Sequence, residues 1–224
     1  NVKTEKVSFG LSDNCDFKAA NIKMEPGSHV YFDIMNGEDK IASIKLKVPG
    51  RHNILNALAA AAAAYISGAT AEAIERGLND YAGAGRRFEI LGKINGITIA
   101  DDYAHHPAEL AATLTAAKEM GFKCVWAVFQ PFTFSRTVML MDDFAEVLKI
   151  PDRVVLAEIM GSREINTYNV HSKDLAAKVP GSVNLPDFQS IADYILNNAS
   201  SGDLVITLGC GDIYKAAKLM LKKS

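Results

Sequence analysis

The sequence has few cysteines and no long apolar segment. Its 224 residues include three cysteines, Cys15, Cys124 and Cys210, which lie far apart and form no Cys-x-x-Cys pair. Scattered cysteines in odd number indicate neither a disulfide framework nor a zinc site, and they fit a reducing cytoplasm. No apolar run reaches about 18 residues, the length that a membrane-spanning helix needs. We therefore expect a cytoplasmic chain without membrane insertion.

Neither sign of charge is in clear excess. The chain has 24 basic and 26 acidic residues, for a formal net charge of -2. This balance gives no general attraction to nucleic acid or to an anionic membrane, so an anionic ligand has to be held by local groups. With 49% hydrophobic residues, the chain can bury one large or two small cores.

A phosphate-binding loop is also missing. The sequence contains no Gly-rich loop that ends in Lys-Ser/Thr, and Gly209 and Gly211 lack the third glycine of a dinucleotide-binding fingerprint. A Rossmann-type dehydrogenase is therefore disfavoured. We interpret Leu208–Ile213 as a strand-to-helix turn in which Asp212 caps the last helix. The chain begins with Asn1 inside an expected strand, Val2–Phe9, so we expect it to be a piece of a longer protein.

The pattern of secondary structure changes near residue 83, which divides the chain into residues 1–83 and 84–224. In the first section we expect strands, an Asn-Gly hairpin turn and two helices. These are Lys6–Gly10, His29–Ile34 and Ile41–Val48, with the turn at Asn36–Gly37, then helices over Asn53–Ser67 and Thr70–Asn79.

In the second section strands alternate with helices, which predicts an α/β fold with a Rossmann-like, mostly parallel sheet. The expected strands are Phe88–Leu91, Ile97–Ala100, Cys124–Phe129, Arg153–Ile159, Ser182–Leu185 and Leu204–Leu208. The expected helices are Pro107–Met120, Thr137–Lys149, Ser172–Val179, Asp187–Asn197 and Asp212–Lys223.

Titratable side chains gather where one of these strands ends. Asp101, Asp102, His105 and His106 follow Ile97–Ala100, and ligands of open α/β sheets bind at the carboxyl ends of strands. These groups could act as acid, base, metal ligand or acceptor for a ribose hydroxyl. Four such groups within six residues are hard to explain by core packing, so we favour a functional site.

Two further clusters could bind a nucleotide. Asn53 and Asn56 are three residues apart and could hydrogen-bond a flat heterocycle from one helical face, although Asn53 as a helix cap and Asn56 as a solvated residue explain them equally well. The arginines of Gly85–Phe88 suit phosphate or carboxylate, but paired surface arginines are common. The loops Gln130–Thr137 and Gly161–Glu164 follow other strands of the same expected sheet.

Five segments occur in the same order in the Mur ligases, and the chain resembles that family over nearly its whole length. They are Gly50–Ala57, Gly85–Phe88, Asp101–Pro107, Phe129–Thr137 and Leu208–Ile213. The resemblance implies that residues 1–83 are the C-terminal part of a central ATP-binding domain and that residues 84–224 are a C-terminal Rossmann-like ligase domain. The phosphate loop, the Mg²⁺ ligands and a UDP-binding domain would lie upstream, so the fragment is expected to be inactive alone.

The loops are most similar to those of members that join L-alanine to UDP-N-acetylmuramate in peptidoglycan synthesis. The resemblance then implies that ATP phosphorylates the muramyl carboxylate and that the amine of L-alanine attacks the acyl phosphate. The C-terminal domain would close over ATP. Most catalysis would come from positioning and charge stabilisation.

By the same resemblance, specific residues take roles in this reaction. Asn53 and Asn56 would contact adenine, and Arg87 and Asp102 would hold ATP. Arg136 would bind the amino acid and the muramyl end, with His105 or His106 beside it. Phe132 stands where the family often has histidine, which argues against an imidazole contact in that loop.

Two alternatives stay open. A related ligase joins a recovered murein tripeptide to UDP-N-acetylmuramate and shares the Asp-Asp-x-x-His-His-Pro segment, although Ser135–Thr137 favours the L-alanine ligase. The chain could also be a non-catalytic nucleotide-binding module, in which case it would bind ATP tightly without the phosphate loop.

Overall fold

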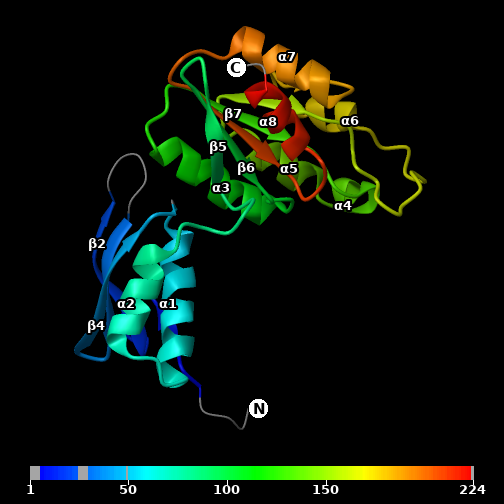
Figure 1. Ribbon diagram of the computed structural model, residues 1–224. Coiled ribbons are helices and arrows are strands. Elements are labelled where there is room, and N and C mark those ends of the chain that lie inside the picture. Colours follow the sequence, from blue (N-terminus) through cyan, green and yellow to red (C-terminus); the bar gives the residue numbers. More distant parts are fainter. Residues whose placement is uncertain (1–5, 25–29, 49, 223–224) are drawn as a thin grey trace. The chain divides into compact units, whose positions relative to one another are not determined.

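The computed structural model describes residues 6–24, 30–48 and 50–222. The chain forms two compact units, Asn1–Gly83 (unit 1) and Ala84–Ser224 (unit 2), drawn in Figure 1 from blue to cyan and from green to red. Each unit has its own hydrophobic core. In the described part of the chain, no helix is long and apolar enough to cross a membrane.

Unit 1 is a four-stranded sheet packed against two helices (Figure 1). The order is β1-β2-β3-β4, with β1 parallel to β2 and the other pairs antiparallel. The elements are β1 (Phe9–Gly10), β2 (Phe17–Met24), β3 (Val30–Asn36), β4 (Asp39–Leu46), α1 (His52–Ile66) and α2 (Ala71–Asp80). Alternate residues of β3 and β4 face the helices, and the small side chains Ala57, Ala61 and Ala62 let α1 approach this face.

Helix α2 protects the outer edge of this sheet. The amide of Ser43 donates to Glu75 Oε2 at 2.9 Å, and the amide of Lys45 donates to Asn79 Oδ1 at 2.7 Å. An edge strand with unpaired backbone groups invites aggregation, so these side chains take the place of a further strand along β4.

Unit 2 is a six-stranded sheet with helices on both faces, as the sequence predicts. The order is β5-β6-β10-β7-β8-β9, and all neighbouring pairs are parallel except β5 with β6. The strands are β5 (Glu89–Ile94), β6 (Ile97–Asp102), β7 (Val125–Phe129), β8 (Arg153–Leu156), β9 (Val183–Asn184) and β10 (Leu204–Leu208). The helices are α3 (Pro107–Glu119), α4 (Phe134–Met139), α5 (Met141–Val147), α6 (Ser172–Ala176), α7 (Phe188–Asn198) and α8 (Tyr214–Leu221).

The two faces of this sheet bury different helices. Helices α3, α5 and α6 pack on one face against side chains such as Ala127 and Ile206, whereas α7 and α8 pack on the other against Trp126 and Val205 (Figure 1). Successive strand residues point to opposite faces, and every residue of β7 and β10 is buried. This explains the continuous apolar runs in the sequence.

Most expected elements of the chain are confirmed. The expected hairpin turn forms one residue later than Asn36–Gly37, as the two-residue loop Gly37–Glu38 with Gly37 at φ 61°. Thr70 caps α2 by accepting from the amide of Ala73 at 3.2 Å. The expected strand Val2–Phe9 lies partly outside the described residues, which show β1 only at its end.

One strand was missed and two expectations were wrong. Strand β2 was not expected, because Phe17–Met24 carries polar residues and a bulge between Ala20 and Lys23 that hides its alternation. The helix expected over Thr137–Lys149 begins earlier and breaks at Leu140 into α4 and α5. Asp212 does not cap α8, since that helix starts after Ile213 without a side-chain cap.

The buried side chain of Leu110 tests the packing of α3 on the sheet. Leu110 is 0% exposed, so Leu110→Ala leaves a cavity, and we expect the free energy of unfolding of unit 2 to fall by about 2–5 kcal/mol. Urea titration followed by the fluorescence of Trp126, the single tryptophan, reports on this unit. The matched variant Leu110→Met keeps most of the volume and should lose less than about 1.5 kcal/mol. Equal losses for the two variants would contradict this packing.

Candidate functional site

Three neighbouring strands of unit 2 end in register and bring their loops to one edge of the sheet. Leu208 of β10 pairs with Asp102 of β6 on one side and with Phe129 of β7 on the other. The bonds continue past the strands, because the amide of Gly209 donates to Asp102 O at 3.1 Å and that of Gln130 donates to Leu208 O at 3.0 Å. The carboxyl edge of β6, β10 and β7 is therefore the candidate site, where open α/β sheets bind ligands.

Asp101 lies inside this edge with both carboxylate oxygens engaged. It is 1% exposed. Its Oδ1 accepts from Thr207 Oγ1 at 2.6 Å, and its Oδ2 accepts from Arg86 Nε at 2.8 Å. A buried carboxylate is tolerated when it is paired and hydrogen-bonded, so the structure of unit 2 accounts for Asp101 without a ligand.

Asp102 is held by the backbone instead. Its Oδ2 accepts from the amide of Phe88 at 2.8 Å and its Oδ1 from the amide of Ala104 at 2.7 Å. Burial raises the pKa of the Asp102 carboxyl, while these two amides and the charge of Arg87 act in the opposite direction. The carboxylate thus ties the turn before β5 to the end of β6.

The two adjacent arginines differ in their surroundings. Arg86 is half-buried, with its guanidinium 4.9 Å from the ring centroids of both Tyr103 and Tyr214. Arg87 is exposed, and its guanidinium lies 5.7 Å from the Tyr103 ring. Of this pair, Arg87 is the one placed to meet an anionic ligand.

The two histidines begin helix α3. His106 is the N-cap and its Nδ1 accepts from the amide of Ala108 at 3.3 Å, while Glu109 Oε2 accepts from the amides of His105 and His106 at 2.9 and 3.2 Å. This capping box satisfies backbone donors that a helix start leaves unpaired. His105 Nδ1 also lies 3.0 Å from Tyr103 O and 3.3 Å from Glu109 Oε2, so one ring nitrogen of each imidazole serves the fold.

Gln130 joins the loops that follow three strands. Its Oε1 accepts from the amide of Asp212 at 3.0 Å, and its Nε2 donates to Glu158 O at 3.4 Å. A Cβ added at Gly211 would lie 2.6 Å from Gln130 Oε1 and 2.5 Å from Met160 Sδ. Gly211 is therefore required by close packing rather than by an unusual φ.

Glu164 fixes the start of α4. Its Oε1 accepts from the hydroxyls of Thr133 and Ser135 at 2.7 and 2.5 Å, and its Oε2 accepts from the amide of Ser135 at 2.8 Å. Gly161 lies beside the same loop, where a Cβ would come within 2.2 Å of the Phe134 ring. The loops after β7 and β8 are thus locked together.

Arg136 follows directly after this locked segment. Its Nη1 is buried and has no hydrogen-bond partner in the described part of the chain. Leaving a charged buried donor unsatisfied costs free energy, so this nitrogen is the strongest indication in unit 2 of a site for an anionic oxygen. At the same carboxyl edge of the sheet, burial raises the pKa of the Cys210 thiol. This disfavours Cys210 as a thiolate nucleophile.

Asn53 and Asn56 belong to unit 1 and pair with each other on α1. Asn56 Nδ2 donates to Asn53 Oδ1 at 3.0 Å, which confirms that the three-residue spacing places them on one face. The interpretation of Asn53 as a helix cap was wrong, because the N-cap of α1 is Arg51 and Asn53 lies within the first turn.

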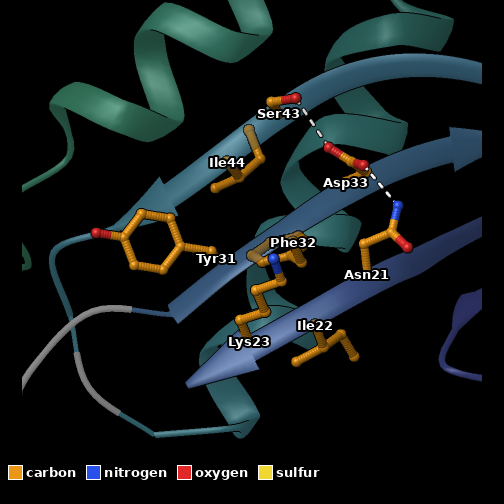
Figure 2. Close-up of a pocket in the computed structure, with 8 residues that line it drawn as sticks. All are labelled: Asn21, Ile22, Lys23, Tyr31, Phe32, Asp33, Ser43 and Ile44. Carbon is orange, nitrogen blue, oxygen red and sulfur yellow. Dashed lines mark hydrogen bonds between the residues drawn. The ribbon is translucent and has the colours of Figure 1, made fainter. Parts of the chain in front are cut away.

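Unit 1 also has a hollow of about 720 Å³ on its sheet, lined by residues of β2, β3 and β4. Figure 2 shows Asp33 between Asn21 and Ser43, and its oxygens accept from Asn21 Nδ2 at 2.9 Å and Ser43 Oγ at 2.8 Å. These polar groups satisfy one another across the three strands. Among the described residues, those that line this hollow include no buried side-chain nitrogen or oxygen without a hydrogen-bond partner.

The sequence places the candidate site at this edge and singles out the segments that contain Arg86, Gln130 and Glu164, but it does not reveal their structural roles or the part of Thr207. Arg86, Gln130, Glu164 and Thr207 form the hydrogen-bonded frame, and their partners are 15 to 123 positions away in sequence. A polar residue directly after a buried strand, as Gln130 follows Phe129, was the available signal. In the described residues, no group of three or more His, Cys, Asp or Glu side chains could hold a metal ion.

The fold and the edge define a Rossmann-like domain with basic groups at the carboxyl ends of its strands. Residues 86–211 match the model of the Mur ligase glutamate ligase domain, and residues 1–64 match that of the Mur ligase middle domain. The chain belongs to the Mur ligase family.

Individual members of the family are similar to this chain over most of its length. The chain is 43% identical to the UDP-N-acetylmuramate--L-alanine ligase of Acetivibrio thermocellus, over 96% of this chain and 47% of that protein. The solved UDP-N-acetylmuramate-alanine ligase of Thermotoga maritima superposes with a TM-score of 0.77 at 25% identity, over 97% of this chain and 47% of that one. A murein peptide ligase from Psychrobacter arcticus gives 0.64 at 25% identity, over 97% and 45%. The chain thus spans about half the length of these relatives.

The hydrogen bonds by which Glu164 links the loop after β8 to the loop after β7 can be tested by titration. Hydrogen bonds from Ser135 and Thr133 lower the pKa of Glu164, so the link is stabilised above the usual pKa of a glutamate and is lost as the pH falls through the lowered value. The double variant Thr133→Val/Ser135→Ala removes both hydroxyl donors, so we expect the pKa of Glu164 to rise. Side-chain NMR titration measures this pKa. The Asp187 carboxyl, whose pKa Ser190 lowers, is an internal reference that should not move. An unchanged pKa of Glu164 would contradict the hydrogen bonds.

Proposed function

We propose that this chain is part of an ATP-dependent ligase that joins L-alanine to UDP-N-acetylmuramate in bacterial peptidoglycan synthesis. The observation that carries the proposal is the buried, unsatisfied Nη1 of Arg136, because a carboxylate or phosphate oxygen of the substrates would complete it. The names of the relatives supply the substrate class. Because the chain spans about half of those proteins, we expect it to be inactive alone.

The proposed reaction has two steps. ATP transfers its γ-phosphoryl group to the muramyl carboxylate, giving an acyl phosphate and ADP. The amine of L-alanine then attacks the acyl carbon, and the tetrahedral intermediate expels phosphate and leaves an amide. Both steps develop charge on oxygen atoms, which fixed cationic donors stabilise.

Within unit 2 we assign each role from the surroundings of the residue. Arg87 is exposed above the Tyr103 ring and is assigned to the transferred phosphoryl group. Arg136 is assigned to the carboxylate of L-alanine and the muramyl end, and His105 or His106 to the same substrates through the ring nitrogen that does not serve the helix. Asp102 is assigned to ATP, to which its oxygens can offer lone pairs beyond the two amide bonds.

In unit 1 the paired amides of Asn53 and Asn56 are assigned to adenine, whose edge carries both donors and acceptors. We propose residues 1–83 as the C-terminal part of the central ATP-binding domain and residues 84–224 as the C-terminal ligase domain. Mg²⁺ would neutralise the phosphates of ATP, and the family resemblance assigns its ligands mainly to the part of the ligase outside these 224 residues. The bacterial cytoplasm, which supplies ATP, is the proposed location.

The substrate assignment is tested with the full-length protein. We expect release of phosphate from ATP and UDP-N-acetylmuramate to depend on L-alanine, and Arg136→Lys to raise the KM for L-alanine by about tenfold or more, since lysine lacks the paired donors of a guanidinium. Arg153→Lys, at an exposed position of β8, is the matched control and should leave the KM for L-alanine unchanged.

Turnover with a murein tripeptide and none with L-alanine would instead identify the related ligase that joins a recovered tripeptide to UDP-N-acetylmuramate. Tight ATP binding by the 224-residue chain without turnover of the full protein would identify a binding module.

The role of Arg87 is tested separately. Arg87→Ala should lower L-alanine-dependent ATP hydrolysis by about 10²-fold, the usual loss when one charge-stabilising donor is removed. Asp102→Asn keeps the shape of the side chain and should impair ATP use while the domain stays folded by circular dichroism. Unchanged turnover of Arg87→Ala, or unfolding of Asp102→Asn, would refute the respective assignment.

A further inference from the structure

We propose that Arg86 is a positioning residue, which locks the turn carrying Arg87 and the loop Gly209–Gly211 in one arrangement. Adjacent arginines invite the interpretation that both bind the anionic ligand. The contacts of unit 2 divide them instead, with Arg86 directed into the fold and Arg87 toward solvent. The catalytic consequence of this lock rests on the proposed function, whereas the lock itself does not.

The guanidinium of Arg86 joins separate parts of the sheet edge. Its Nε donates to Asp101 Oδ2 at the end of β6, and its Nη2 donates at 2.6 Å to Gly209 O after β10. Its Cζ lies 4.9 Å from the ring centroid of Tyr103 and from that of Tyr214, the first residue of α8. These contacts use two of the five N–H groups of the guanidinium and place it beside two aromatic rings, so its position is set by the fold of unit 2.

The backbone of Arg86 is held just as firmly. Its amide donates to Glu89 Oε2 at 2.7 Å, and its carbonyl accepts from the amide of Tyr103 at 2.7 Å. Arg86 and Phe88 have φ values of 58° and 45°. Residues other than glycine adopt this region of backbone conformation at a cost in free energy. The surrounding hydrogen bonds compensate that cost, and the intervening residue is Arg87.

Charge explains why the lock needs this side chain. Asp101 is almost fully buried, and in the described part of the chain Arg86 is the cation that forms an ion pair with it. Removing one partner of such a pair strands the other charge in a medium of low polarity. A lysine would restore the charge, but as a point donor it cannot bond Asp101 and Gly209 in the planar geometry of the guanidinium.

The position of Arg87 follows from this lock. Its guanidinium approaches the same Tyr103 ring that stacks on Arg86, and the next amide, of Phe88, is bound to Asp102. Loosening Arg86 therefore displaces Arg87 and the loop after β10 together. Misplacement of a charge-stabilising group by about 1 Å can cost up to 10²-fold in rate.

Hydrogen exchange of the 224-residue chain tests the lock directly. In Arg86→Lys we expect the amides of Tyr103 and Gly209 to exchange at least about tenfold faster, because local opening becomes easier. The amide of Ala157, bonded to Phe129 O at 2.9 Å, should keep its rate, as should all amides in the control Arg153→Lys. If Arg86→Lys does not fold, Tyr214→Leu removes one stacking ring and should raise the same two rates. Unchanged rates at Tyr103 and Gly209 in a folded variant would overturn the proposal.

Kinetics of the full-length ligase separate positioning from mere structural support. Arg86→Lys should lower kcat by about tenfold and leave the KM for L-alanine within twofold, because Arg87 moves while Arg136 does not. Faster exchange with unchanged kcat and KM would overturn the positioning role, as would a rise in KM alone. If the wild-type protein shows no ligase activity, the proposed function fails, and the exchange rates still decide for or against the lock.

Discussion

A buried carboxylate has to be matched by a cation, and at the carboxyl edge of unit 2 that requirement organises the site. Asp101 sits at the end of a central strand with almost no exposure, and the pairing with Arg86 brings the turn before β5 against β6 and β10. The adjacent Asp102 binds the same turn through the amide of Phe88. Two consecutive carboxylates thus fix the backbone from which Arg87 projects.

Many polar residues at this edge serve the fold, and few are left for a ligand. His106 and Glu109 cap α3, Gln130 holds the loop after β10, and Glu164 holds the start of α4. Against this satisfied background the buried Nη1 of Arg136 is an exception. A rigid frame around a small number of cationic donors is what charge stabilisation by positioning requires.

Membership of the Mur ligase family agrees with this division. A Rossmann-like sheet hosts many unrelated activities, so the fold alone does not define the reaction. The arrangement at the edge, together with relatives named for joining L-alanine to UDP-N-acetylmuramate, supports the proposed ligase. In the proposed reaction the 224 residues would supply one set of charge-stabilising donors.

The sequence by itself determined the class of fold, most elements and the edge at which the site lies, because apolar periodicity, caps and turn residues act locally. It did not reveal β2, whose bulge interrupts the pattern, or the break at Leu140. Only the tertiary structure decided that β10 inserts between β6 and β7, which places Gly209 against Arg86 across 123 positions. Adjacent arginines look alike in a sequence, and burial beside Asp101 is what separates Arg86 from Arg87.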